Sequence, residues 1–304
     1  MSSILLFGAD GQVGWQLQRA LAPLGAVRAL NRSHCDLSDL DAVRRVLREQ
    51  KPSLVVNASA YTAVDKAESE GELAQRINAE VVGLMAEEAR RAEALFVHYS
   101  TDYVFDGRKD THYLESDATN PQSAYGRSKR AGELAIEASG CRALVFRTSW
   151  VFAARGHNFV KSILRLAGER DALRVVADQV GSPTSAELIA DVTALALATL
   201  RQRGEAPDGM GLYHLVSANP VSWHAFATAI VATAQATPGF ALKAAPSAIA
   251  PITTADYPLP APRPANSRLS TAKLEADFGL KMPDWQPYLA RMLDQLGREQ
   301  PVRN

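Results

Sequence analysis

The chain has 304 residues, with 33 basic and 33 acidic side chains and a formal net charge of +0. Its hydrophobic fraction of 47% is typical of a globular protein with a substantial core, and its length suits one large or two modest domains. Because neither a basic surplus nor a dense block of one charge is present, we expect no nucleic acid and no membrane surface among its partners.

The start of the chain and its cysteines indicate a cytoplasmic location. The first residues, MSSILLFGAD, lack the features of a secretory signal, and no apolar run approaches the roughly 20 residues needed to span a bilayer. Cys35 and Cys141 are far apart and belong to no CxxC motif, as expected in a reducing compartment. The six histidines lack the spacing of a zinc site, so a protein-bound zinc is not expected.

The first half of the chain alternates strand-like and helix-like segments. Short apolar runs predict five buried strands, at 4–8, 26–30, 53–59, 94–100 and 142–150. Helical patterns lie between them, at 12–24, 36–52, about 67–92 and 123–139. This alternation predicts an α/β fold of Rossmann-like, doubly wound type, with a parallel sheet, right-handed crossovers and helices on both faces.

The pattern loosens after residue 150. Helices are predicted at 158–169, 185–203, 222–235 and 285–297, and strands at 173–178 and 211–216. Six prolines fall within 246–268, which we therefore expect to be an ordered loop or extended wrap. We divide the chain into a dinucleotide-binding domain at 1–150 and a smaller substrate-binding domain at 151–304, with segments near 185–216 returning to the first.

A glycine turn follows the first predicted strand. Gly8, Gly11 and Gly14 have the spacing GxxGxxG and open the first helix. The first two glycines allow a tight turn and close approach to a pyrophosphate, whereas the third lets the helix lie on the strand. The helix N-terminus then faces the anion. The turn therefore predicts a dinucleotide site.

The end of the second strand bears on the choice between NAD and NADP. Asn31 and Arg32 stand there, and no carboxylate follows until Asp36. An arginine suits a 2′-phosphate, so NADPH is favoured, with NADH left open and a solvated turn as the alternative for Arg32. Asp36 and Leu37 are placed to meet the adenine ring, with helix capping as the alternative for Asp36.

Tyr125 and Lys129 form a YxxxK pair on one face of a predicted helix. A lysine cation beside a phenol would lower its pKa from about 10 toward the range useful for proton transfer. Thr101 lies at the carboxyl end of the fourth strand, where open α/β sheets bind ligands. Its hydroxyl could stabilise a carbonyl oxygen that gains negative charge. These residues predict carbonyl reduction.

The glycine turn, the hydroxyl residue after the fourth strand and the YxxxK pair together resemble the extended short-chain dehydrogenase/reductase family. More narrowly, residues 4 to about 293 resemble its dTDP-4-dehydrorhamnose reductase branch. The similarity is carried by NASAYTAVDKAE (57–68), HYSTDYVFDG (98–107), YGRSKRAGE (125–133), FRTSWVF (146–152), DQVGSPT (178–184), GLYHLV (211–216) and RPANSRL (263–269).

The resemblance implies a role for each matching residue. Tyr125 would donate a proton, Lys129 would be its partner, and Thr101 would bind the carbonyl in place of the serine commoner in the wider family. The residues expected to contact the cofactor through the resemblance are Gly11, Gln12, Val13, Ala60, Tyr61, Thr62 and Tyr99. Asp102 and Trp150 would contact the substrate.

Each further substrate candidate has a structural alternative. Arg263 could bind a pyrophosphate in a forked geometry, but it could also be a surface arginine beside prolines. Asn158 could face an anion at a helix start or simply cap that helix. Trp150 could be core packing, and Asp65 could pair with Thr62 as a helix cap. Asn266, Ser267 and Phe159 are additional candidates.

Some members of this branch have a divalent-metal site that bridges two subunits through glutamates. Gln16 stands where the resemblance implies a glutamate, whereas Glu187 remains from such a set. A need for Mg²⁺ is therefore in doubt, and a homodimer formed without metal stays open.

The resemblance implies reduction by NADPH of the C4 ketone of dTDP-4-dehydro-6-deoxy-L-mannose (dTDP-4-dehydrorhamnose) to dTDP-L-rhamnose, a precursor for lipopolysaccharide O-antigen. One alternative is a non-catalytic NADP-binding subunit like the β subunit of methionine adenosyltransferase. Another is a nucleotide-sugar epimerase or dehydratase, which would retain its nicotinamide through the cycle.

Overall fold

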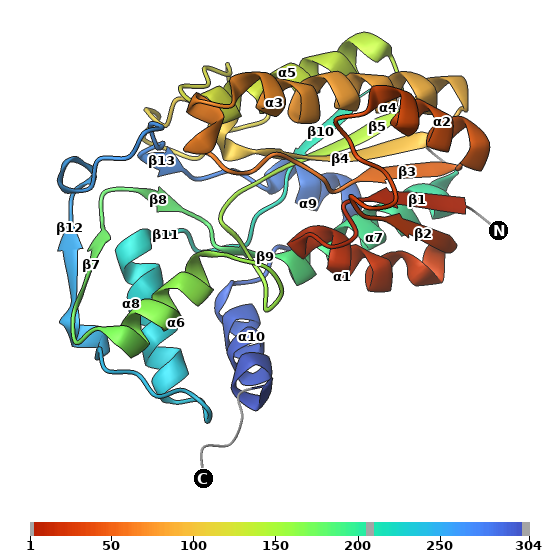
Figure 1. Ribbon diagram of the computed structural model, residues 1–304. Coiled ribbons are helices and arrows are strands. Elements are labelled where there is room, and N and C mark those ends of the chain that lie inside the picture. Colours follow the sequence, from red (N-terminus) through yellow and green to blue (C-terminus); the bar gives the residue numbers. More distant parts are fainter. Residues whose placement is uncertain (1–2, 205–209, 300–304) are drawn as a thin grey trace.

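A computed structural model describes residues 3–204 and 210–299 (Figure 1). Its centre is a six-stranded parallel sheet in the order β10-β5-β4-β3-β1-β2. The strands are β1 (Ser3–Phe7), β2 (Ala26–Leu30), β3 (Leu54–Asn57), β4 (Leu95–Thr101), β5 (Ala143–Thr148) and β10 (Met210–His214). The predicted Rossmann-like α/β fold is therefore confirmed.

Helices cover both faces of the sheet, as Figure 1 shows. On one face, α1 (Gln12–Leu21) and α7 (Ala186–Arg203) pack on the apolar side chains of alternate strand positions. On the other face lie α2 (Leu40–Gln50), α4 (Val81–Arg91) and α5 (Ala124–Ser139). Because both faces are buried, the strands are almost continuously apolar, and the buried polar residues Asn57 and His98 stand out.

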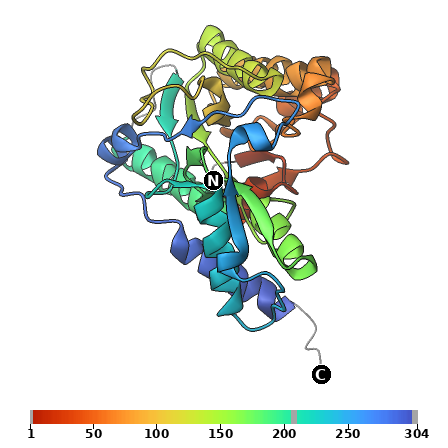
Figure 2. The same cartoon turned by 90° about the vertical axis from the view of Figure 1, so that its left-hand side faces the viewer.

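A smaller layered unit lies beside the carboxyl edge of the sheet (Figure 2). Its helices α6 (Phe159–Glu169), α8 (Trp223–Gln235) and α10 (Gln286–Glu299) enclose a separate apolar core. Two small sheets flank it: β7 (Leu173–Val176) pairs with β12 (Ile249–Ile252), and β8 (Val180–Gly181) lies between β11 (Val221–Ser222) and β13 (Asn266–Ser267). Within the described ranges, no helix is long and apolar enough to cross a bilayer.

Two helix predictions were wrong at their boundaries. The helix expected at 36–52 begins at Leu40, because the Asp39 carboxylate accepts a hydrogen bond from the Ala42 amide at 2.9 Å and caps it there. The segment 67–92 is not one continuous helix. It consists of η2 (Lys66–Glu68), α3 (Gly71–Gln75) and a short π-helix, η3 (Arg76–Glu80), before α4 begins. In the π-helix, the Asn78 side chain accepts a hydrogen bond from the Tyr61 amide and donates one to the Tyr61 carbonyl oxygen.

The later half of the chain contributes to both units. β10 pairs with β5 and completes one edge of the main sheet, and α7 packs against α1. The proline-rich segment contains only the short strands β12 and β13 and two 3₁₀ turns, as its composition predicts. A short helix, α9 (Ala272–Phe278), follows it and was not predicted. The division into domains at residue 150 stays a prediction.

Candidate active site

The glycine turn joins β1 to α1 at the carboxyl edge of the sheet. Gly8 has φ of +87°, a conformation that side chains disfavour. A Cβ on Gly14 would lie 2.0 Å from the Gly8 carbonyl oxygen, so only glycine lets the helix approach the turn this closely. Gly11 is the N-cap of α1, and no side chain caps the first amides there. The turn therefore leaves the N-terminus of α1 available to an anion.

A cavity of about 750 Å³ opens above this turn. Its volume lies within the usual range of cofactor and ligand sites, about 300–1,000 Å³. Nearly every residue predicted to contact the cofactor lines it: Gly8, Gly11, Gln12, Val13, Asn31, Arg32, Asp36, Leu37, Ala60, Tyr61, Thr62, Tyr99, Tyr125 and Lys129. Gly14 does not line the cavity, because it packs beneath the turn. The lining thus has the residues that a dinucleotide requires.

The loop after β2 is preorganised by its own side chains. The side-chain oxygen Oδ1 of Asn31 accepts hydrogen bonds from the Ser33 amide at 3.1 Å and the Ser33 hydroxyl at 2.7 Å. The Asp36 carboxylate accepts from the Ser38 amide and lies 3.4 Å from the exposed Arg32 guanidinium. The Ser38 backbone bond is the largest cause that lowers the pKa of Asp36. Capping of α2 by Asp36 is excluded, because Asp39 occupies that position.

Tyr125 and Lys129 both come from α5, which begins where Ser123 caps it. Both side chains are buried and line the same cavity. Lys129 Nζ lies 2.6 Å from the Tyr99 carbonyl oxygen and 3.1 Å from His98 Nε2. The expectation that Lys129 lowers the pKa of Tyr125 was wrong for this state: burial raises that pKa, against a smaller opposing effect of the Thr101 hydroxyl. Tyr125 is therefore a protonated phenol at neutral pH.

Three polar side chains meet on the other side of Tyr125. The Thr101 hydroxyl donates to Asp102 Oδ1 at 2.9 Å, and the Ser267 hydroxyl donates to Asp102 Oδ2 at 2.5 Å. All three residues are buried. The Thr101 proton is thus committed to Asp102, so binding a carbonyl would require that hydroxyl to rotate. Burial raises the pKa of Asp102 to about 6, although both hydroxyl donors oppose the rise.

Replacing Asp102 by asparagine is expected to flatten the dependence of stability on pH. The folded-state pKa, about 6, exceeds the ordinary value of 3.8, so protonation stabilises the fold below pH 4 and this contribution is lost as pH rises through 6. The displacement corresponds to about 3 kcal/mol. Urea unfolding of both proteins at pH 4 and pH 8 measures it. Equal changes in the two proteins would contradict the raised pKa.

Arg263 joins the proline-rich segment to the nucleotide-binding half. Its Nη2 lies 2.8 Å from Asp65 Oδ2, and the Asp65 Oδ1 accepts from the Ala261 amide at 3.2 Å. Asp65 therefore makes no helix-capping bond, and that alternative was wrong. The guanidinium lies 5.9 Å from the centre of the Tyr103 ring, which packs edge-on against Tyr125. Arg263 Nη1 is buried and has no hydrogen-bond partner among the described residues.

The remaining substrate candidates are held by structural contacts. Trp150 stacks on Trp223 at 3.4 Å between ring centres, and its φ of +48° is rare for a bulky residue. Asn158 caps α6 and donates to Gln12 Oε1 at 2.8 Å. Asn266 donates to backbone carbonyl oxygens of the loop after β4, and Phe159 packs on Trp223. Thr101, Asp102, Trp150, Asn158 and Arg263 do not line the cofactor cavity, so their roles toward substrate stay predictions.

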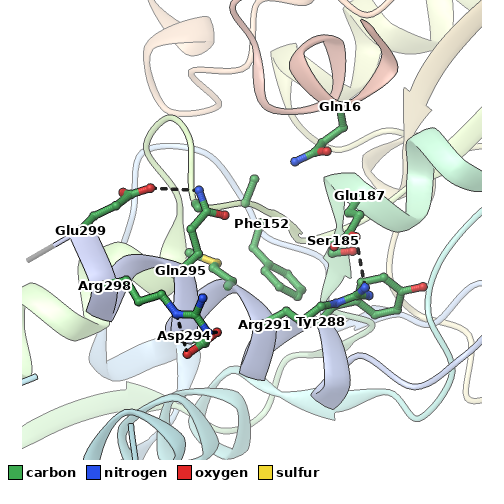
Figure 3. A pocket seen from close by; sticks show the side chains of 13 residues that line it. Gln16, Phe152, Ser185, Glu187, Tyr288, Arg291, Asp294, Gln295, Arg298 and Glu299 are labelled. Carbon is green, nitrogen blue, oxygen red and sulfur yellow. Dashed lines mark hydrogen bonds and ion pairs between the residues drawn. The ribbon is translucent and has the colours of Figure 1, made fainter. Parts of the chain in front are cut away.

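Gln16 and Glu187 line a second cavity, of about 550 Å³, between α1, α7 and α10 (Figure 3). Glu187 lies 3.2 Å from Arg291, and Asp294 lies 2.7 Å from Arg298. These two carboxylates are thus paired with guanidinium groups, and a third, Glu299, accepts a hydrogen bond from Gln295 at 3.0 Å. In residues 3–204 and 210–299, no group of three or more His, Cys, Asp or Glu side chains could hold a metal. Within one chain, the second cavity therefore offers no set of ligands for a divalent metal.

Asn57 and His98 are site residues that the sequence analysis missed. His98 is fully buried and contacts Lys129 directly, whereas Asn57 contacts His98 from the neighbouring strand. A signal was available, because each is a polar residue within an otherwise apolar predicted strand. Ser100 and Thr148 also line the cavity and have no hydrogen-bond partner for their buried hydroxyls among the described residues.

Comparisons with known proteins agree with this geometry. Residues 1–298 match the family model described as RmlD substrate binding domain. A dTDP-4-dehydrorhamnose reductase of Burkholderia thailandensis is 54% identical over 93% of this chain and 95% of the relative. A solved dTDP-4-dehydrorhamnose reductase of Clostridium acetobutylicum has a TM-score of 0.87 and 34% identity, covering 97% of this chain and 99% of that one.

The cofactor assignment has a counterpart among the solved relatives. A dTDP-4-dehydrorhamnose reductase of Bacillus anthracis, solved in complex with NADP, has a TM-score of 0.85 and 32% identity. It covers 97% of this chain and 99% of that one. Matches of this extent, together with a nucleotide cavity that contains the YxxxK pair, show that the chain belongs to the dTDP-4-dehydrorhamnose reductase family of oxidoreductases.

Proposed function

We propose that the protein reduces the C4 ketone of dTDP-4-dehydro-6-deoxy-L-mannose to dTDP-L-rhamnose with NADPH. The observation that carries this proposal is the placement of Tyr125 and Lys129, which line the same cavity as the glycine turn. Burial keeps the phenol of Tyr125 protonated at neutral pH, so it has a proton to donate to a carbonyl oxygen. The relatives named above act, by their names, on this class of sugar nucleotide.

Bound NADPH supplies the hydride that reduces C4. Tyr125 donates its phenolic proton to the ketone oxygen, which becomes the C4 hydroxyl, and the phenolate recovers a proton from solvent. One proton is therefore consumed with each ketone. Thr101 turns from Asp102 toward the developing oxyanion, and Asp102 orients the sugar hydroxyls. The buried, water-poor setting strengthens each of these interactions.

The proposal is tested by turnover. Purified protein, NADPH and the dTDP-ketosugar are expected to lose absorbance at the reduced nicotinamide band and to form dTDP-L-rhamnose in equal amounts. Parallel assays with NADH and with a GDP-ketosugar measure the choice of cofactor and nucleotide. If absorbance stays constant while an authentic reductase consumes NADPH under the same conditions, the proposal fails.

Arg263 is our candidate for the substrate pyrophosphate. Its unpartnered Nη1 leaves a donor free for an anion, whereas Nη2 is held by Asp65. Arg263→Lys keeps the charge but removes the fork, so KM for the sugar nucleotide is expected to rise roughly tenfold with a smaller change in kcat. Steady-state kinetics measures both constants, and Arg165→Lys, in an exposed pair, is the control. An unchanged KM would remove Arg263 from the binding site.

We also propose that the protein acts in the cytoplasm, and that any homodimer forms without metal because Gln16 stands in place of the expected glutamate. Its two cysteines are buried and unpaired, as suits a reducing compartment. Light scattering with and without a chelator tests the assembly. A mass that falls to one chain in the chelator would contradict a metal-free dimer.

A further inference from the structure

A buried hydrogen-bond chain runs from the active-site lysine into the sheet. Lys129 Nζ lies 3.1 Å from His98 Nε2, and His98 Nδ1 lies 3.3 Å from Asn57 Nδ2. Asn57 and His98 are directly paired residues of β3 and β4, so their side chains share one face of the sheet. All three residues are at most 1% exposed. Each member of the chain therefore depends on protein groups for its hydrogen bonds.

Asn57 fixes which groups donate and which accept along these hydrogen bonds. The Ser59 backbone amide donates to Asn57 Oδ1 at 3.0 Å, and a backbone N–H can only donate. The Asn57 NH₂ group must then face His98, so His98 Nδ1 is the acceptor. Neutral imidazole carries one proton, which in consequence lies on Nε2, the nitrogen that faces Lys129.

A protonated lysine does not fit beside that N–H. Its ammonium group has three donors and no acceptor, so Nε2–H and an ammonium would oppose each other at 3.1 Å. A neutral amine satisfies both contacts, because its lone pair accepts from His98 Nε2–H while one N–H donates to the Tyr99 carbonyl oxygen at 2.6 Å. The geometry thus selects the uncharged form of Lys129.

The charged and titratable groups around Lys129 support this selection. Burial lowers the pKa of Lys129 to about 8, against a smaller opposing effect of Glu133 on the same helix, so the uncharged amine is the main form only above that pH. Glu133 is itself paired with Arg147 of β5, and Arg130 is a further partner. Burial also lowers the pKa of His98, so His98 stays neutral. Tyr125 on α5 and Tyr99 on β4 are protonated phenols, because burial raises the pKa of each.

We propose that Asn57 and His98 are positioning residues that favour the neutral amine of Lys129 in the cofactor-free protein, so that the site loses its cation as the pH rises. The proposal rests on the proposed reduction. When Tyr125 protonates the ketone oxygen, its phenolate needs a nearby positive charge, and a neutral amine supplies none. The tautomer of His98 therefore sets the pH above which the site lacks its cation.

Asn57→Asp is expected to reverse the direction of the hydrogen bonds from residue 57 through His98 to Lys129. An aspartate still accepts from the Ser59 amide, but it also accepts from His98 Nδ1–H, which moves the bare nitrogen to Nε2. Nε2 then accepts from a Lys129 ammonium group. We expect the pH midpoint of Lys129 in the free protein to rise by about one unit or more. Titration of the lysine ¹³Cε resonances measures it, with Lys129→Arg for assignment. An unchanged midpoint, or a wild-type midpoint equal to that of a free lysine, would overturn the proposal.

A double variant separates the tautomer from simple charge attraction. In Asn57→Asp with His98→Phe, the carboxylate remains but no imidazole connects it to Lys129. We expect less than half of the shift to survive, relative to His98→Phe alone. A shift of equal size with and without His98 would show plain electrostatic attraction and reject the positioning role. His98→Gln, whose carbonyl can turn to the lysine, is expected to raise the midpoint even if Asn57→Asp fails to fold.

The same proposal makes a kinetic prediction about the alkaline limb of the pH profile, where kcat/KM falls as pH rises. In Asn57→Asp this limb is expected to move upward in pH with the ¹³C midpoint, which is roughly a tenfold gain in relative rate for each unit on the falling side. A role confined to packing would lower the rate at every pH without moving the limb. The NMR titration needs no substrate. It therefore tests the proposed effect on Lys129 even if the protein does not reduce the ketosugar.

Discussion

Tyr125→Phe is expected to lower kcat by roughly 10²- to 10⁴-fold, the usual contribution of a positioned proton donor. The substitution removes only the hydroxyl, so the edge-on contact of the ring with Tyr103 persists. Binding of NADPH, measured by fluorescence titration, should change little, because most of the cavity lining is untouched. Steady-state turnover of the ketosugar at several pH values measures kcat.

Tyr213→Phe is the matched control. The Tyr213 hydroxyl bonds Asp277 at 3.0 Å, and the residue lies in the edge strand β10, outside the cofactor cavity. Its removal should cost stability but not kcat. If Tyr125→Phe turned over at a rate near that of the parent protein, the proton would have to come from another group, and the proposed chemistry would be abandoned.

Glu133→Gln is expected to lower the free energy of unfolding by about 3–5 kcal/mol, as breaking a buried ion pair usually does. Arg147 Nε and Nη2 lie 2.8 and 2.7 Å from the two oxygens of Glu133, and both side chains are at most 2% exposed. Arg147 Nη1 already lacks a hydrogen-bond partner among the described residues. The glutamine would leave the guanidinium with no compensating charge in an apolar interior. Urea unfolding at pH 7 measures the loss.

Two further variants show whether the pair itself is responsible. Glu169→Gln breaks the exposed Glu169–Arg165 pair and should cost less than about 1 kcal/mol. Replacing Glu133 and Arg147 together by leucine and methionine should recover much of the loss, because no charge is then left buried. Burial opposes ionisation of Glu133, but Arg147 keeps its pKa below the ordinary value. The contribution of ionised Glu133 to the free energy of unfolding is therefore lost as pH falls through that lowered pKa.

Features encoded in short windows could be predicted from the sequence. The glycine turn, the alternation of elements and the YxxxK pair each depend on spacing within one or two adjacent elements. A local sequence pattern was therefore enough to predict each of these features. The structure brings most of the predicted cofactor residues to one cavity. The predicted start of α2 was wrong because Asp36 and Asp39 could both cap the helix. Only the backbone conformation shows that Asp39 is the N-cap.

Features that depend on distant partners could not be predicted. Which protonation form of Lys129 is favoured depends on His98 and Asn57, which lie on one face of neighbouring strands in register. The partner of Asp65 lies 198 residues away, beyond any local pattern. Trp150 is held by Trp223, and Gly181 leaves room for it, since a Cβ there would come within 2.6 Å of the indole. In each case the tertiary contact, rather than the residue type, decides the role.

The Asp65 carboxylate links the proline-rich segment to the main unit through one ion pair and one backbone hydrogen bond. Asn266 and Ser267 hold the end of the segment separately. Local opening confined to the stretch around Ala261 and Arg263 therefore breaks few interactions and takes far less free energy than separation of the central strands. The Ala261 amide should accordingly exchange its hydrogen with solvent much faster than the amides of β4. Excursions of this stretch would leave the parallel sheet and its glycine turn intact.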